Sequence, residues 1–170
     1  MMLDLLSQDC SLQELIDKAT ELLGNPVILT DNRFRVLYNS RNVKVEIPMW
    51  KNALEEKYIS NEMITSIVDS ELAKGGRNGD AAVSQLPNGY HAMRKPLYYK
   101  MQYCGFIGIY DYFREFTEED RISLGIIAKA VSALICSDKE FISYDDNAYS
   151  SLLYQMLGCK TREEARHVLK

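Results

Sequence analysis

The residue with the clearest chemical potential is Arg94, in a run whose polar and apolar residues alternate as in a strand. Alternation places Arg94 on the same face as Ala92 and Tyr98 and places His91 on the opposite face. An arginine that faces a pocket can bind a carboxylate or a phosphate through two parallel hydrogen bonds. The alternative is an arginine on an edge strand that extends into solvent, since arginine is seldom buried without a charged partner.

Aromatic side chains could complete a ligand pocket around such an arginine. Ligand pockets are mostly apolar, with a few polar groups that orient the ligand. The residues predicted to line a pocket of this kind are Tyr38, Trp50, Tyr98 and Tyr110. The alternative for each of them is ordinary packing in the core.

Other chemistry-bearing residues do not form the pattern of an active site. His91 has no second ligand at a spacing typical of a metal or haem site. Cys104 lies among apolar residues, which favours an inert thiol over a reactive one. The acidic residues are adjacent to one another near helix starts, on a helix face or in a linker, whereas acid–base catalysis needs two groups that converge in a cleft. We therefore expect no enzymatic activity, no metal and no cofactor.

A glycine-rich stretch at residues 75–80, GGRNGD, invites comparison with phosphate-binding loops. Such a loop follows a strand and opens a helix. Here a predicted helix precedes the stretch and a predicted strand follows it. The order of elements favours a polar connector.

Composition excludes several classes of protein. The chain has 170 residues, of which 46% are hydrophobic, and a formal net charge of −4. This is enough for one domain with a real core, and the acidic balance disfavours nucleic-acid binding by this chain alone. No apolar run reaches the roughly 18 residues that a membrane span needs. The widely spaced cysteines (Cys10, Cys104, Cys136 and Cys159) are typical of reduced thiols in a cytoplasmic protein.

Periodicity predicts the elements that would position the candidate residues. Ser11 and Glu14 fit a capping box for an amphipathic helix that includes Leu22 in its apolar stripe and stops at Gly24. The elements predicted after it are a hairpin at 27–38, helices at 47–58 and 60–72, strands at 82–86, 90–98 and 103–112, and a helix at 117–136.

Two of these elements carry a more specific expectation. The strand at 103–112 is apolar on both faces, which predicts a central strand covered on both sides. The helix at 117–136 should bury a stripe made of Ile122, Ile126, Ala130, Ala133 and Leu134. The order of elements predicts an α+β fold in which an antiparallel sheet of about five strands is flanked by helices. The first and last helices would share one face, and the 47–72 helices would cover a pocket on the other.

Two segments resemble a known family. SLQELIDKATELLGNPVILTDNRFRVLYNS resembles the opening of the GAF-like sensor domain of PucR/CdaR-type bacterial transcription regulators. SSLLYQMLG, followed by TREEARHVL, resembles the start of the middle region of those regulators. The resemblance implies a GAF/PAS-like sensor domain at 1–138 and, at 139–170, a linker with a helical extension that begins a truncated downstream domain.

The resemblance also implies a function. We expect a cytoplasmic, non-enzymatic domain that senses a small metabolite, forms a homodimer and reaches DNA only through a domain absent from this chain. The resemblance implies no membrane partner. One alternative is a dimerisation or signal-relay module without a ligand of its own, and another is a small GAF-related enzyme.

Overall fold

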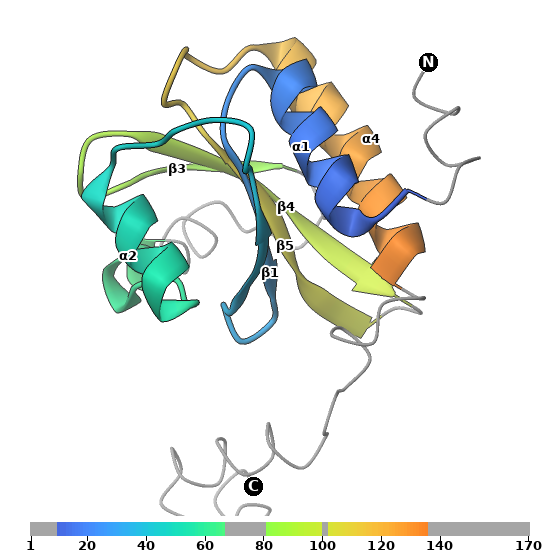
Figure 1. Ribbon diagram of the computed structural model, residues 1–170, viewed down its shortest axis with the longest axis horizontal. Coiled ribbons are helices and arrows are strands. Elements are labelled where there is room, and N and C mark those ends of the chain that lie inside the picture. Colours follow the sequence, from blue (N-terminus) through green and yellow to red (C-terminus); the bar gives the residue numbers. More distant parts are fainter. Residues whose placement is uncertain (1–9, 67–80, 100–101, 136–170) are drawn as a thin grey trace, which may run out of the picture. The chain divides into compact units, whose positions relative to one another are not determined.

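A five-stranded antiparallel sheet forms the centre of the computed structural model, which describes residues 10–66, 81–99 and 102–135. The strand order is β2-β1-β5-β4-β3, so the doubly apolar strand β5 is central, as its sequence predicts (Figure 1). The predicted α+β fold is confirmed. The strands are β1 (Val27–Asp31), β2 (Val36–Asn39), β3 (Ala82–Gln85), β4 (His91–Tyr99) and β5 (Gln102–Tyr110).

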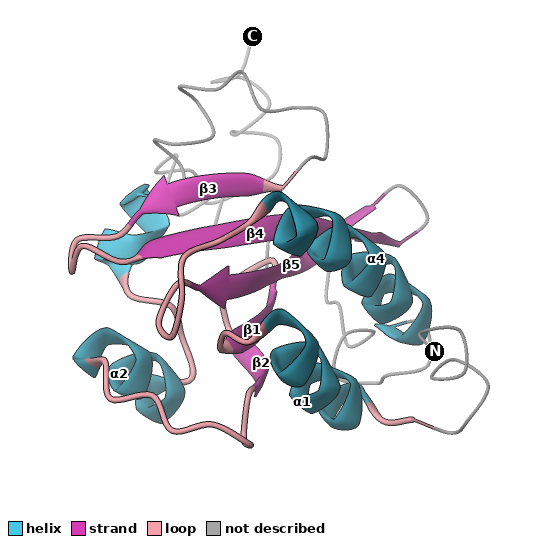
Figure 2. Cartoon of the chain, turned by 90° about the horizontal axis from the view of Figure 1, so that it is seen from above, coloured by secondary structure: helices cyan, strands magenta, loops and turns pink. Residues whose placement is uncertain are grey.

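Helices cover both faces of the sheet. Helices α1 (Leu12–Leu23) and α4 (Glu118–Ile135) lie side by side on one face, and α2 (Pro48–Glu56) lies on the other (Figure 2). Residues 61–66 are also helical, and the rest of the helix predicted at 60–72 lies outside the described residues. The predicted division into two helical layers is therefore present.

The ends of α1 are fixed by the residues that the sequence indicates. The Glu14 amide donates to the Ser11 hydroxyl at 3.3 Å, and the Ser11 amide donates to the Glu14 carboxylate at 2.8 Å. This is the predicted capping box. Gly24 ends the helix in the left-handed conformation, with φ of 61°, which glycine adopts at little cost.

The predicted apolar stripe of α4 is wrong except at Ala130, which is buried. Ile122 and Ile126 are 60% and 48% exposed, and the face that packs on the sheet is a different one. Asp120, at the third position of the helix, turns inward into a network of hydrogen bonds described below, and this fixes the rotation of the helix about its axis. The residues four, seven and eleven positions further along therefore face the sheet: Leu124, Ile127 and Val131. Leu22 of α1, also predicted to be buried, is 54% exposed.

Strand β1 approaches β5 unusually closely at Gly105. A Cβ atom at this position would lie 2.0 Å from the carbonyl oxygen of Thr30, and the φ of Gly105 is 144°. Only glycine fits such a position without moving the backbone. Because β1 ends opposite Gly105, the β4–β5 hairpin beyond this point pairs with no third strand among the described residues.

Several predictions fall outside the described residues. They include the domain boundary near residue 138, the segment 139–170, the glycine-rich stretch at 75–80, and Cys136 and Cys159. These remain predictions.

Candidate functional site

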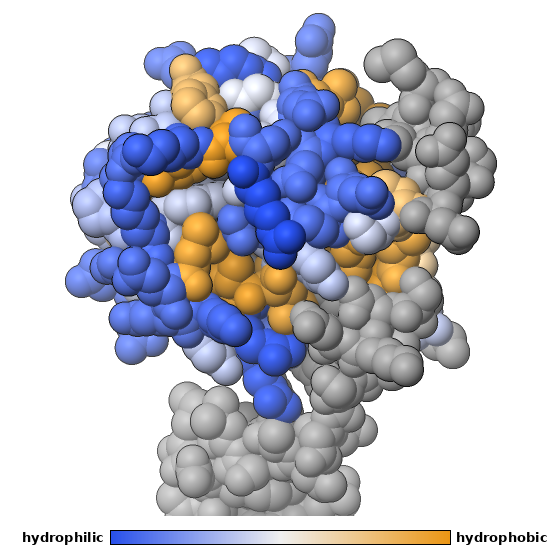
Figure 3. Space-filling view, in the orientation of Figure 1, coloured by the Kyte–Doolittle hydropathy of each residue, from blue (hydrophilic) through white to orange (hydrophobic). Residues whose placement is uncertain are grey.

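The space between the sheet and α2 is filled by an apolar cluster, which we call the α2-side core. Apolar residues also reach the surface between α2 and β1 in the space-filling view (Figure 3). The buried members of the α2-side core are Ile28, Val45, Ile47, Trp50, Ala53, Ile59, Met63, Leu86, Ala92, Phe106 and Tyr110.

Arg94 lies within this apolar layer. Arg94 is 4% exposed, although its strand, β4, lies next to the edge strand β3. It stands opposite Ala82 on β3 and Gly108 on β5, and residues opposite one another in a sheet share a face. A Cβ atom at Gly108 would lie 3.5 Å from Arg94 Cγ, so the arginine stem crosses the space that this glycine leaves. The alternative of a solvent-exposed arginine on an edge strand is therefore wrong.

Three polar side chains surround Ala92 on the α2-facing side of the sheet. Ser84 on β3 and Tyr110 on β5 stand opposite Ala92 on its two sides. Arg94 is two residues further along β4, which makes it a diagonal neighbour of both, at a Cα separation of about 7–8 Å. Ser84 is 5% exposed, and its hydroxyl has no hydrogen-bond partner among the described residues. The methyl group of Ala92 thus lies between a serine, a tyrosine and an arginine.

Tyr110 and Arg94 differ in their charge. Burial raises the pKa of Tyr110 above its ordinary range, while the charge of Arg94 opposes this rise. The phenol is therefore neutral at physiological pH. A guanidinium stays protonated in proteins, so Arg94 keeps its charge inside an apolar layer.

Helix α2 covers the site and is held mainly by Trp50. The Trp50 ring meets the Tyr110 ring edge to face, with centroids 5.1 Å apart. Of the nine residues of α2, only Trp50 and Ala53 are buried, whereas α1 buries six of its residues and α4 seven. No side chain caps the start of α2. Among these three helices, α2 therefore contributes the least burial to the fold.

The structure brings together three of the five predicted site residues: Trp50, Arg94 and Tyr110. Tyr38 stands opposite Leu29, beyond a register shift in the β1–β2 pair, and is not part of the α2-side core. Tyr98 is 50% exposed and packs against the exposed Tyr103 at the end of the β4–β5 hairpin. That any of these five residues binds a ligand stays a prediction.

Sequence reasoning missed Ser84. Alternation along the short strand AVSQ could have placed this residue on the same face as Ala82, but nothing in the sequence indicates that its hydroxyl is buried.

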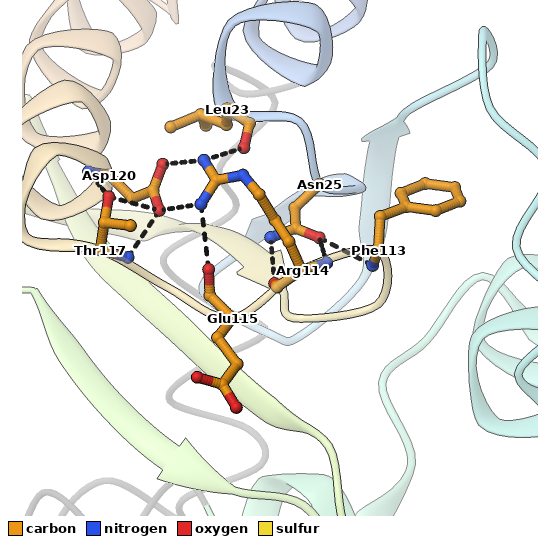
Figure 4. A network of polar contacts seen from close by, with 7 residues as sticks. All are labelled: Leu23, Asn25, Phe113, Arg114, Glu115, Thr117 and Asp120. Carbon is orange, nitrogen blue, oxygen red and sulfur yellow. Dashed lines mark hydrogen bonds and ion pairs between the residues drawn. The ribbon is translucent and has the colours of Figure 1, made fainter.

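A second polar group joins the start of α4 to the end of α1 (Figure 4). The Arg114 guanidinium donates to both carboxylate oxygens of Asp120, at 2.8 and 2.6 Å, and to the carbonyl oxygen of Leu23 at 2.7 Å. The Asp120 carboxylate also accepts the Thr117 amide at 2.8 Å. Asn25 fixes the loop by accepting the Arg114 amide at 3.3 Å and donating to the Arg114 carbonyl at 2.8 Å. One arginine therefore connects both helices of this layer.

The pKa values of this pair are shifted in opposite directions. Burial by itself would raise the pKa of Asp120, but hydrogen bonds from Arg114 and Thr117 outweigh burial, and the pKa is lowered. The hydrogen bond to Asp120 raises the pKa of Arg114. Both groups are therefore charged at neutral pH.

The loop after β5 connects the α2-side core to the Arg114–Asp120 pair. Tyr112 packs against the α2-side core, and its hydroxyl accepts a hydrogen bond from the Glu46 amide, just before α2, at 3.2 Å. Arg114 follows only two residues later. A displacement of α2 would therefore act on the same short loop that positions α4.

His91 lies apart from this site. It stands opposite Gln85 on the sheet face away from α2, and its Nδ1 is 2.8 Å from Asp111 Oδ2. Within the described residues, no three His, Cys, Asp or Glu side chains are grouped so that they could hold a metal ion. None of the helices in the same part of the chain is long and apolar enough to cross a membrane.

Comparison with known proteins finds solved structures of related shape. The chain is similar to the cofactor-binding GAF domain of the nutrient sensor CodY from Clostridium difficile, with 17% identity and a TM-score of 0.42 over 74% of this chain and 84% of that chain. It is also similar to a protein from Rhodococcus sp. RHA1 assigned as a transcriptional regulator, with 17% identity and a TM-score of 0.46 over 76% and 69% of the two chains. No family model and no curated protein matches the chain.

Proposed function

We propose that this chain is the small-molecule-sensing and dimerising part of a bacterial transcription regulator of the PucR/CdaR type, without enzymatic activity. The observation that carries the proposal is Arg94, a charged side chain that is buried on the same face of the sheet as the α2-side core. A guanidinium can hold an anion, but it stays protonated and cannot act as a general base. Its position in an apolar layer suits recognition of a ligand better than catalysis.

The signal would leave the site through the loop after β5. A ligand that occupies the α2-side core acts on Trp50 and therefore on α2. The hydrogen bond between the Glu46 amide and Tyr112 transmits a displacement of α2 to this loop, and Arg114 transmits it to α4. The ligand shifts the equilibrium only as far as its affinities for the two arrangements of α2 differ.

A thermal-shift screen of a broad metabolite panel tests this function. A ligand at one hundred times its dissociation constant stabilises the fold by about 2.7 kcal/mol, which is readily visible as a rise in the melting temperature. Trp50 is the chain's single tryptophan, so its fluorescence reports directly on the site. Sensing is refuted if no metabolite changes either the melting temperature or the Trp50 emission.

A specific observation also favours the second candidate, a dimerisation module without a ligand. Ile122 and Ile126 lie one turn apart on the exposed side of α4, and Leu22 is exposed on the neighbouring α1. Exposed aliphatic residues gathered in this way are typical of surfaces that pack against a partner. Light scattering after size exclusion separates the cases: a dimer that responds to no metabolite supports this candidate, and a strict monomer at high concentration refutes dimerisation.

A further inference from the structure

We infer that the exposed face of α4 binds the same face of a second copy of this chain, with the two helices antiparallel. In this arrangement Ile122 of each copy packs on Ile126 of the other, and Glu119 of each copy pairs with Lys129 of the other. The inference rests on the dimerising part of the proposed function and specifies the surface, the partner and the orientation.

The exposed residues of α4 follow the spacing of helices that pack lengthwise against each other. From its second residue to its end, the helix exposes residues separated by three, four, three and four positions: Glu119, Ile122, Ile126, Lys129 and Ala133. This spacing averages 3.5 residues and keeps one stripe of side chains turned toward a partner helix. We call these residues the α4 seam.

The middle of the α4 seam is apolar and open. Ile122 and Ile126 are 60% and 48% exposed, while the opposite side of the helix packs on the sheet. On the flank of the seam, a Cβ atom at Gly125 would meet no atom within 4 Å. The helix beside α4 on this face of the sheet is α1, whose Leu22 is also exposed (Figure 2). A second helix therefore has room beside the two isoleucines.

The charges of the α4 seam identify a second copy of the chain as the partner. A two-fold symmetric interface joins the same surface of both copies, so that surface must complement itself. Glu119 lies three residues before Ile122, and Lys129 lies three residues after Ile126. An acid, two isoleucines and a lysine in this order are their own complement when the order is reversed. Antiparallel helices therefore place an acid opposite a lysine at both ends of the isoleucine contact.

The same charges exclude a parallel pair in register. Parallel helices would place Glu119 opposite Glu119 and Lys129 opposite Lys129, and like charges that face each other repel. The antiparallel arrangement replaces both repulsions by attractions. Because the seam contains few of the roughly 20–30 residues that each side of a standard interface contributes, we expect a weak dimer, with a dissociation constant of about 1–100 μM.

Sedimentation equilibrium of the 170-residue chain and its charge variants tests the surface and the orientation. Glu119→Lys and Lys129→Glu each place two pairs of like charges in the antiparallel dimer, and each should raise the dissociation constant about tenfold. The double variant exchanges the two charges and should restore the dissociation constant to within about threefold of the original. Glu55→Lys makes the same change on an exposed residue of α2 and should leave the dimer unchanged.

A second measurement separates effects on the dimer from effects on the fold. Besides the hydrogen bond to Asp120, the charge of Glu119 contributes to the raised pKa of Arg114, so Glu119→Lys also acts on the pair that joins α1 to α4. The melting temperature of dilute, monomeric protein reports this effect. If Glu119→Lys lowers that temperature, Lys129→Glu decides the test, because Lys129 is not among the groups that shift the pKa of Arg114 or Asp120.

The outcomes separate the inference from the function on which it rests. A strict monomer at high concentration overturns the inference and dimerisation together, and the response to metabolites then decides sensing by itself. If Ile122→Glu destabilises such a monomer, the occupant of the seam is another part of the same chain. If the chain is a dimer that no seam variant weakens, dimerisation stands and the α4 seam is not its interface. If Ile122→Glu dissociates the dimer but neither charge variant weakens it, the antiparallel pairing is overturned.

Discussion

Replacing Arg114 by alanine should destabilise the domain more than the exposure of this arginine suggests. The substitution removes two hydrogen bonds to Asp120 and one to the carbonyl oxygen of Leu23. The Asp120 side chain is only 5% exposed, so its carboxylate would lose its charged partner in a place that water reaches poorly. The end of α1 and the start of α4 would lose their common contact.

The size of the effect follows from burial. Removing one partner of a fully buried ion pair costs about 3–5 kcal/mol. The Arg114 side chain is 41% exposed, so water replaces part of what is lost, and we expect about 2 kcal/mol. For a chain of this length, that corresponds to a melting temperature lower by about 4–8 °C. Arg114→Lys keeps the charge but cannot donate in parallel to both oxygens, so about half of the loss should remain.

Urea unfolding followed by Trp50 fluorescence measures these changes. A double-mutant cycle with Asp120→Asn should give a coupling energy of about 1–2 kcal/mol between the two side chains. Lys51→Ala, which removes an exposed ion pair with Glu46, serves as the control and should leave the unfolding midpoint unchanged. The reasoning is refuted if Arg114→Ala unfolds at the wild-type urea concentration or if the two substitutions are additive.

Three further predictions concern other parts of the fold. Asp120 has a lowered pKa in the folded state, so its contribution is present above its unfolded value of about 3.9 and is lost as the pH falls through the folded value. Asp120→Asn should therefore flatten the decline of stability with acid between about pH 5 and pH 3, and an unchanged slope in pH-dependent urea titrations would contradict this. Gly105→Ala should prevent folding, as judged by circular dichroism, because the new Cβ would meet the backbone of β1, whereas Gly125→Ala in α4 meets no atom within 4 Å and should raise stability by up to about 1 kcal/mol. Ile122→Glu together with Ile126→Glu should convert a dimer to a monomer in light scattering, and the monomer should stay folded with a cooperative melting transition. If the dimer survives both changes, the exposed face of α4 is not the dimer interface.

The fold was largely predictable because its signals are local. The capping box at Ser11, the turn at Gly24 and the doubly apolar strand β5 each act over a few residues. The rotation of α4 was not predictable, because apolar residues occur on almost every side of that helix. Its orientation depends on Arg114, which reaches Asp120 from outside the helix. A contact between a loop and a helix leaves no periodic signal in the sequence.

The candidate site was predictable only in part, for a related reason. Alternation correctly placed Arg94 and Ala92 on one face, because no bulge separates them. Tyr98 is exposed because it lies on the part of the β4–β5 hairpin that extends past β1. The extra residue of the register shift after Leu97 is Cys104 on β5, so the alternation along β4 is not reversed. Tyr38 lies beyond a register shift whose extra residue, Leu37, is on β2 itself. A bulge reverses which face the following side chains of its own strand occupy, and no feature of this sequence indicates where the bulge falls.

The two ends of α2 are attached to the domain in different ways. After the helix, the Lys57 carbonyl accepts the Val36 amide at 2.9 Å and the Ile59 amide donates to the Phe34 carbonyl at 2.9 Å, so the chain there pairs with the strand beside it. Before the helix, the Glu46 amide donates to a single hydroxyl, that of Tyr112. An outward movement of α2 would therefore be a rotation about its carboxyl end, near Lys57 with its left-handed φ of 58°. Such a rotation would displace the buried Val45 and Ile47 and break the contact with Tyr112, which makes this tyrosine a point at which the loop after β5 detects that α2 has moved.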